Sequence, residues 1–161
     1  MEEKTSQTYA ALLHQLQRPF PPTYVHWKPV AIKNGRALAV AYIDARLVMQ
    51  RMDQVFGPAG WTDQYEFLTG DRVLCTLSAK VDGVWVAKRD IGSPSDQDNS
   101  GDQLKAAVSD AFKRAAVKWG IGRYLYNLPT QWLDYDEKKG FLQQPQLPAW
   151  AIPDPNPSTR P

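Results

Sequence analysis

Residues that build metal and redox centres are scarce in this sequence of 161 residues. It contains one cysteine, Cys75, and two histidines, His14 and His26. One cysteine cannot form an internal disulfide, and so few ligands cannot build a thiolate-rich zinc or iron–sulfur site. A single cysteine also fits a reducing compartment, so we expect a cytoplasmic protein without a structural metal site.

Long apolar runs and enzyme motifs are absent as well. No segment approaches the roughly 18 apolar residues that a membrane-spanning helix needs, and Met1-Glu2-Glu3 lacks the basic start and apolar stretch of a signal peptide. The sequence has no G-x-x-x-x-G-K-[ST] phosphate loop, no G-x-S-x-G nucleophile elbow and no paired-carboxylate metal motif. We expect a protein that is neither membrane-bound nor exported, and we expect no enzymatic activity.

Charge of one sign does not dominate. The 19 basic and 17 acidic residues give a net charge of +2, so only the placement of the charges can indicate a nucleic-acid-binding protein. The hydrophobic share of 43% is typical of a globular protein. We predict one domain over residues 1–144, followed by a proline-rich tail or linker over residues 145–161, where no periodicity is visible.

Hydrophobic periodicity and turn residues predict alternating helices and strands, and hence an α+β fold. Helices are expected at Ser6–Gln17, Asp44–Phe56 and Ser100–Trp119, and strands at Ala37–Ile43, Trp61–Leu68, Val73–Val81 and Val84–Ile91. Asp44 is the predicted N-cap of the second helix, and Ser100 with Gln103 forms the predicted capping box of the third. Trp27 is placed in a loop, and the polar segment 92–101 is expected to be exposed.

The dipeptide Asp82-Gly83 between two alternating runs predicts a tight β-hairpin. Its two-residue turn fixes the register of the strands and leaves one face largely apolar, with Cys75 on it. The other face presents Lys80, Trp85 and Arg89, and the lysine and the tryptophan lie across the strands from each other. A cation–π pair on this face could line a nucleic-acid groove, although an ordinary solvent-exposed face is the commoner explanation.

On the third predicted helix, apolar residues fall on one arc about 100° wide, as expected of a stripe that faces a core. They are Leu104, Val108, Ala111, Phe112, Ala115 and Trp119. The remaining surface carries basic residues against a single acid, Asp110, and one more basic residue follows the helix. These basic residues are Lys105, Lys113, Arg114, Lys118 and Arg123. Clustered cations of this kind bind phosphates, but a solvated basic helix face without a ligand is also common.

Residues 108–126, VSDAFKRAAVKWGIGRYLY, closely resemble the signature of the DdrA (DNA damage response protein A) family. That family is similar in turn to the Rad52/Rad22 single-strand annealing superfamily. Further matching segments are residues 24–29, 42–46, 60–61, 89–92 and 127–129, so the resemblance extends over most of the chain.

The resemblance implies a ring-shaped homo-oligomer, and it implies no cofactor and no ATP. Each subunit would pack a twisted antiparallel β-sheet, in a β-β-β-α core, on a long helix and leave a basic groove for single-stranded DNA. By motif, groove residues of the annealing relatives correspond to Arg46, Lys105, Lys113 and Arg114. Two positions depart from the annealing pattern, because a further basic position falls on Val117, with Lys118 next to it, and an aromatic position falls on Pro58.

These departures favour the bacterial branch of the resemblance, whose members bind 3′ single-stranded ends and protect them from nucleases. We therefore expect a non-enzymatic DNA repair protein of the bacterial cytoplasm, associated with the nucleoid when DNA is damaged. Lys118 and Arg123 join the groove positions as predicted DNA contacts, and Lys80, Trp85 and Arg89 are secondary candidates. Two other functions remain open: annealing of complementary strands, and a structural oligomer whose basic helix face binds acidic protein partners.

Overall fold

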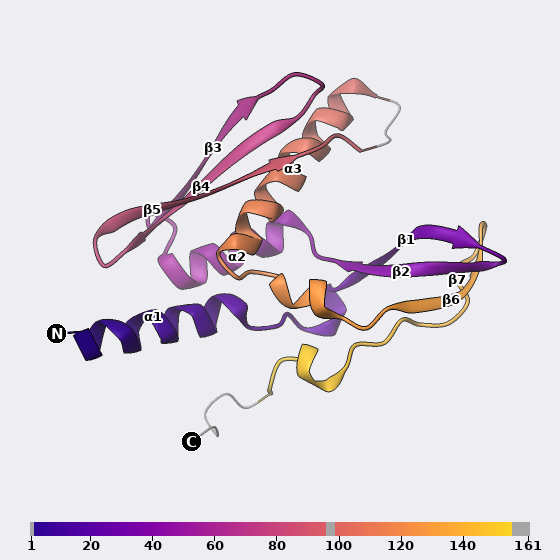
Figure 1. Cartoon of the computed structure of the whole chain (residues 1–161), viewed down its shortest axis with the longest axis horizontal. Coiled ribbons are helices and arrows are strands. Elements are labelled where there is room, and N and C mark those ends of the chain that lie inside the picture. Colours follow the sequence, from indigo (N-terminus) through magenta and orange to yellow (C-terminus); the bar gives the residue numbers. More distant parts are fainter. Residues whose placement is uncertain (1, 96–98, 156–161) are drawn as a thin grey trace. The chain divides into compact units, whose positions relative to one another are not determined.

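Figure 1 shows the computed structural model of the chain, in which residues 2–95 and 99–155 are described. The chain divides into two compact units, each built from two separate stretches of sequence. The first comprises Met1–Gln17 and Asp44–Arg123, and the second comprises Arg18–Ile43 and Tyr124–Pro161. Both contain antiparallel strands and the first contains α-helices, so the predicted α+β class is confirmed. The single domain expected over residues 1–144 stays a prediction.

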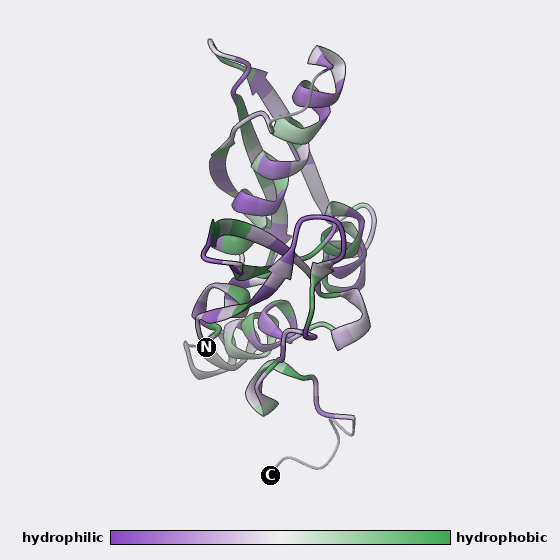
Figure 2. Cartoon of the chain, turned by 90° about the vertical axis from the view of Figure 1, so that its right-hand side faces the viewer, coloured by the Kyte–Doolittle hydropathy of each residue, from purple (hydrophilic) through white to green (hydrophobic). Residues whose placement is uncertain are grey.

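The first unit combines an antiparallel sheet, in the order β3-β4-β5, with helices. Its elements are α1 (Glu2–Gln17), α2 (Ala45–Phe56), β3 (Trp61–Phe67), β4 (Val73–Val81), β5 (Val84–Gly92) and α3 (Ser100–Lys118). Each is predicted from the sequence, and the main difference is that α1 begins at Glu2 instead of Ser6. Hydrophilic and hydrophobic residues alternate along these ribbons in Figure 2. Among the described helices, none has the length and apolar character needed to cross a bilayer.

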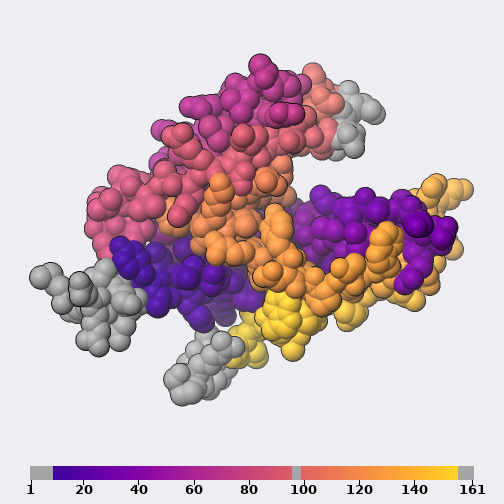
Figure 3. Space-filling model, in the orientation of Figure 1, coloured from indigo at the N-terminus to yellow at the C-terminus, as the bar shows by residue number. Residues whose placement is uncertain are grey.

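The β4–β5 hairpin has the predicted turn and register. Asp82 and Gly83 have φ values of 48° and 79°, as a type I′ turn requires, and Val81 lies opposite Val84. Alternate residues of β4 are buried, and we call the face that they occupy the inner face of the sheet and the opposite one the outer face. The buried residues are Val73, Cys75, Leu77 and Ala79. Figure 3 shows the atoms of β3 to β5, in magenta and pink, as a continuous surface in this view.

Helix α3 packs on the inner face at very close range. Ala107, Ala111 and Ala115, at every fourth position, are buried and keep this side of the helix narrow. A Cβ atom at Gly92, the last residue of β5, would lie 2.2 Å from the Ala111 nitrogen and 2.3 Å from the Ala107 oxygen. Glycine is therefore required at this position because two backbones approach each other there.

The ends of α3 differ in part from the prediction. The N-cap is Asn99, whose side-chain oxygen accepts a hydrogen bond from the Gly101 amide at 2.8 Å, so the assignment of the cap to Ser100 is wrong. Leu104, predicted to be a core residue, is 38% exposed, because β5 ends level with the following turn of the helix. Trp119 is buried as predicted, and its Nε1 donates to the Leu77 carbonyl at 3.1 Å.

A buried arginine joins α1 to α2. Arg51 is only 7% exposed, and its Nη1 donates to the carbonyl oxygens of Gln15 and Leu16, each at 3.1 Å. These carbonyls lie in the last turn of α1, where no further helical amide is available to them. A cation at this end of a helix is also favourable to the helix dipole. Arg51 therefore caps α1, a role that periodicity along α2 does not reveal.

The second unit contains an antiparallel sheet in the order β1-β2-β6-β7. Its strands are β1 (His26–Lys33), β2 (Arg36–Tyr42), β6 (Gln131–Asp136) and β7 (Gly140–Phe141). The 3-10 helices η1 (Pro22–Tyr24) and η3 (Ala149–Ala151) belong to this unit, and η2 (Arg123–Asn127) begins at its boundary.

The loop assignment of Trp27 is wrong, since this residue lies in β1 opposite Ala41 of β2. Nearly all residues of β1 are exposed, so the strand lacks the alternation of buried and exposed positions that identifies strands in a sequence. A register shift between Pro29 and Ile32 interrupts its pairing. Proline is tolerated there because β1 is an edge strand.

Part of the expected proline-rich tail is packed. Pro145 and Ala151 are buried. The Gln131 side-chain amide donates to the Gln146 carbonyl, and its oxygen accepts from the Gln146 amide, each at 2.9 Å. This part of the segment therefore differs from an extended tail, while the domain boundary at residue 145 stays a prediction. Residues 156–161 of the tail, and residues 96–98 of the expected exposed loop, lie outside the described residues.

Replacing Gly92 with alanine is expected to lower the free energy of unfolding by about 3 kcal/mol, because the new Cβ atom would overlap the backbone of α3. Urea unfolding followed by circular dichroism measures this change. Gly101→Ala is a matched control, since a Cβ atom there meets only the Asn99 side-chain oxygen, at 3.3 Å. Equal stability of the two variants would contradict the close approach of α3 to β5.

Candidate nucleic-acid interface

The basic residues predicted to contact DNA on α3 do not form a single stripe. At about 100° per residue, Lys113 and Arg114 point in directions roughly 100° apart, and Lys118 lies on the Arg114 side of the helix. Lys105 lies about two turns closer to the N-terminus, where its Nζ pairs with Asp102 at 3.5 Å. The structure therefore brings Arg114 and Lys118 together and separates them from Lys105 and Lys113.

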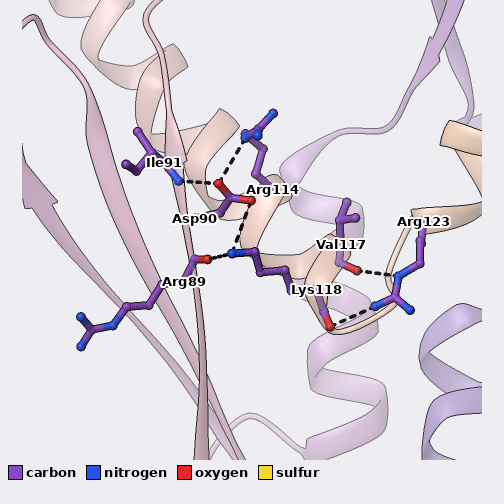
Figure 4. Close-up of polar contacts among 7 residues, drawn as sticks. All are labelled: Arg89, Asp90, Ile91, Arg114, Val117, Lys118 and Arg123. Carbon is purple, nitrogen blue, oxygen red and sulfur yellow. Dashed lines mark hydrogen bonds and ion pairs between the residues drawn. The ribbon is translucent and has the colours of Figure 1, made fainter.

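Arg114 and Lys118 share one carboxylate, that of Asp90 on β5 (Figure 4). Arg114 Nε lies 3.5 Å from Asp90 Oδ1, and Lys118 Nζ lies 3.9 Å from Asp90 Oδ2. Lys118 Nζ also donates to the Arg89 carbonyl oxygen, and Asp90 Oδ1 accepts from the Ile91 amide at 2.7 Å. We call Asp90, Arg114 and Lys118 the Asp90 cluster. It carries two positive charges against one negative charge.

The interpretation of a basic helix face opposed only by Asp110 is wrong. Asp110 Oδ2 accepts a hydrogen bond from the Ser93 amide at 3.0 Å and thus holds the segment that leaves β5. Asp102, in the first turn of α3, pairs with Lys105, and Asp90 pairs with Arg114 and Lys118. Asp90 is a site residue that sequence reasoning missed, because it comes from a different element than the cations that it faces.

Arg123 has a structural role at the end of α3. Its Nε donates to the Val117 carbonyl and its Nη2 to the Lys118 carbonyl, each at 3.0 Å (Figure 4). These carbonyls belong to the last turn of the helix, where a bound cation is favourable. Arg123, one of the predicted DNA contacts, therefore has a structural role that needs no ligand.

Arg46 and Lys113 lie on neighbouring helices of the first unit. Arg46 is exposed in the first turn of α2, directly after Ala45, and Lys113 is half-buried in the middle of α3. Helix α2 packs against α3 through an aromatic contact, in which the rings of Phe56 and Trp119 are 5.5 Å apart. The predicted primary contacts thus all belong to the first unit, on the two neighbouring helices α2 and α3.

Lys80, Trp85 and Arg89 occupy the outer face of the sheet. Lys80 lies directly opposite Trp85, which is 50% exposed. The Arg89 side chain points away from the Asp90 cluster, to the other side of β5 (Figure 4). A cation–π contact is formed instead on the inner face, where Lys88 Nζ lies 5.7 Å from the centre of the Trp119 ring. The secondary candidates therefore form a surface separate from that of α3.

The buried thiol offers no nucleophile at neutral pH. Burial raises the pKa of Cys75 to about 11. The neighbouring Tyr65 is also affected, since its hydroxyl donates a hydrogen bond to Asp63 at 2.7 Å. Burial, together with this hydrogen bond, raises the pKa of Tyr65 far above its usual value. Within residues 2–95 and 99–155, no three His, Cys, Asp or Glu side chains are grouped so that they could hold a metal ion. The surface does carry cationic nitrogens of lysine and arginine side chains, and such groups bind anions.

Comparison with known proteins places the chain in a class. It belongs to the Rad52/22 family of double-strand break repair proteins, whose family model matches residues 8–140. Two curated proteins, both named single-stranded DNA-binding protein DdrA, are similar over 143 residues: the one from Deinococcus radiodurans is 44% identical and the one from Deinococcus deserti 46%. The match covers 87% of this chain and 67% and 69% of those relatives. The resemblance predicted from residues 108–126 is thus confirmed.

Replacing Arg123 with alanine is expected to lower the free energy of unfolding by about 1 kcal/mol, because two carbonyls at the end of α3 lose their charged donor. Urea unfolding in the absence of DNA measures the effect. Arg46→Ala serves as the control, since Arg46 is exposed and its loss is expected to leave stability nearly unchanged. If both variants unfold like the wild type, Arg123 does not act as a helix cap.

Proposed function

We propose that the chain binds single-stranded DNA and shields 3′ ends from nucleases, as a homo-oligomeric ring and without catalysis of its own. What carries the proposal is the identity of 44% and 46% with two proteins named single-stranded DNA-binding protein DdrA, in a chain with basic residues on α3. The ring and the preference for 3′ ends are implied by the resemblance to the DdrA family. The protein would act in the cytoplasm, at the nucleoid.

Phosphate binding by α3 and α2 is the physical basis of the proposal. Arg46, Lys105, Lys113 and Arg114 are the proposed primary contacts, and Lys118 and Arg123 extend them. A guanidinium group has five N–H donors, and Arg114 faces Asp90 with its Nε, at 3.5 Å from Oδ1. Such a side chain can keep a carboxylate partner and still offer donors to a phosphate. Lys105, whose side chain is 82% exposed, is likewise held only by a surface ion pair.

The outer face of the sheet supports a second contact path. Bases of a single strand stack on exposed aromatic rings, and Trp85 presents such a ring on a face that also carries two basic residues. Lys80 lies across the strands from it, and Arg89 lies on the same face of β5. Because this face is separate from α3, it would bind a different stretch of the strand.

A DNA end is protected when the protein occupies it, and no chemical reaction is required. A strand held by phosphate contacts is inaccessible to a nuclease, and no nucleophile or metal is required for that. With a net charge of +2, one subunit has little surplus charge with which to attract DNA. Repetition of the same contacts around a ring would multiply weak subunit affinities.

Annealing of complementary strands is the second candidate. It is less well supported, because Val117 and Pro58 stand where the annealing relatives have a basic and an aromatic residue. Pro58, in the turn after α2, offers no ring on which a base could stack. A third possibility, an oligomer that binds acidic proteins through α3, uses the same cations and is separated from the first two by a DNA-binding assay.

Replacing Arg46 and Lys105 together with alanine is expected to weaken binding to a single-stranded oligonucleotide. Each lost phosphate contact should reduce the slope of log Kobs against log salt concentration by about 0.7. Fluorescence anisotropy over a series of salt concentrations measures both quantities. These residues are suitable for the test because both side chains are exposed.

The matched control is a double alanine variant of Lys138 and Lys139, two exposed lysines in the turn between β6 and β7. It removes the same charge and should change the affinity and the slope much less. If both double variants lose affinity equally, binding depends on total charge and the assigned interface is wrong.

End protection is tested with oligonucleotides labelled for digestion from either end. The protein is expected to slow a 3′-to-5′ exonuclease more than a 5′-to-3′ exonuclease, because the strand is held at its 3′ end. Mass measurement in solution, with and without the oligonucleotide, should give a multiple of the 18.2 kDa chain. Equal protection of both ends, or a monomer under all conditions, would remove the corresponding part of the proposal. Accelerated pairing of complementary strands would favour annealing instead.

A further inference from the structure

Two of the cations proposed to bind phosphate are already occupied by a carboxylate of the protein. Asp90 contacts Arg114 through Oδ1 at 3.5 Å and Lys118 through Oδ2 at 3.9 Å. The two oxygens thus face two cations at once, as two oxygens of a phosphate group would. Asp90 side-chain atoms are 24% exposed, so the cluster is accessible from solvent.

Asp90 is held in place by more than its charge. Its Oδ1 also accepts the Ile91 amide at 2.7 Å, which fixes the carboxylate on the strand. Gly92, two residues further along β5, packs closely on the backbone of α3, so Asp90 lies on a stretch of strand that is close to the helix. The carboxylate therefore remains beside Arg114 and Lys118 when other anions approach.

The cations, in contrast, are attached to the carboxylate only weakly. Both distances are longer than those of a charge-assisted hydrogen bond, about 2.7–2.9 Å, and about half of each cationic side chain is exposed. Ion pairs of this kind contribute about fivefold or less to an equilibrium. A phosphate can therefore replace Asp90 as the partner of either cation without disrupting the fold.

We infer that Asp90 is a built-in competitor for DNA phosphate, which occupies Arg114 and Lys118 in the free protein and limits how tightly a strand is held. This inference rests on the proposed function and adds a residue that sets its strength. In the free protein the cluster has a net charge of +1, from two cations and one carboxylate. When a phosphate binds, the cations turn to it while Asp90 stays on β5 and repels it.

The test is Asp90→Asn, which removes the charge but keeps a side-chain oxygen for the Ile91 amide. The variant is expected to bind a labelled single-stranded oligonucleotide about three- to tenfold more tightly at low salt. The slope of log Kobs against log salt concentration should steepen by about 0.7 if one further phosphate is neutralised. Urea unfolding checks that the fold is intact. If Asp90→Asn fails to fold, Asp90→Ser, which also retains an oxygen, takes its place.

Asp134→Asn is the matched control for the change in charge. Asp134 is an exposed carboxylate that pairs with Arg36 Nε at 3.9 Å in the second unit, so the same charge is removed from a similar ion pair. Its affinity and salt slope should stay close to those of the wild type. A gain as large as that of Asp90→Asn would mean that net charge alone is responsible, and this would overturn the inference.

A second measurement asks whether Asp90 acts through the two cations. Asp90→Asn is combined with Arg114→Gln and Lys118→Gln, and the affinity is compared with that of the Arg114→Gln, Lys118→Gln protein. The gain should disappear in this background, because no cation is left to be released. A gain that persists would show that Asp90 acts simply as a nearby negative charge, against the inference.

The outcomes separate this inference from the proposed function. If the wild type binds the oligonucleotide and Asp90→Asn binds no more tightly, the competitor role is wrong and single-strand binding stands. Weaker binding by a folded Asp90→Asn would identify Asp90 as a residue that orients Arg114, which is also contrary to the inference. If neither protein binds DNA at any salt concentration, the proposed function fails and the inference fails with it.

Discussion

The contact between the backbones of β5 and α3 determines where the charged groups of the first unit lie. Side chains alternate along a strand, so Lys88, Asp90 and Gly92 all face α3. Gly92 touches the backbone of α3 at Ala107 and Ala111. With the strand held at that distance, Asp90 reaches Arg114 and Lys118, and Lys88 reaches the Trp119 ring. A larger residue at position 92 would move the strand outward and alter each of these contacts together.

Local neutralisation characterises the electrostatics of the chain, and the contact of β5 with α3 is one source of it. The sequence has 19 basic and 17 acidic residues, and the structure places acids directly beside several of the bases. Asp102 lies beside Lys105, Asp134 beside Arg36, and Asp90 between two cations of α3. Anion binding by such a surface would require the anion to replace a carboxylate as the partner of a cation. A surface of this kind also limits indiscriminate attraction of polyanions, because the field of each cation is partly cancelled nearby.

Local sequence signals predicted the first unit well. The Asp82-Gly83 turn gave the hairpin and its register, and the apolar stripe of α3 gave the helix that covers the sheet. Strand β1 was missed because an exposed edge strand that contains Pro29 has no alternation to detect. The positions of the basic residues were visible in the sequence, but their partners were not. Asp90 faces residues more than 20 positions away, and such a pairing depends on how two elements pack and not on spacing along either one.

The Asp90 cluster also bears on how a nearly neutral chain could hold DNA and still release it. In the proposed ring the cluster would recur in every subunit that a strand crosses, and the effects on affinity would multiply from one subunit to the next. A threefold loss per subunit would then become about a ninefold loss over two subunits. Strong unpaired cations repeated in this way would make dissociation very slow, and a repair intermediate must eventually be passed on. A carboxylate fixed beside the proposed phosphate contacts would keep each one weak, so that occupancy would depend on the number of subunits engaged. Length of the exposed strand, rather than the strength of any single contact, would then decide whether an end stays covered.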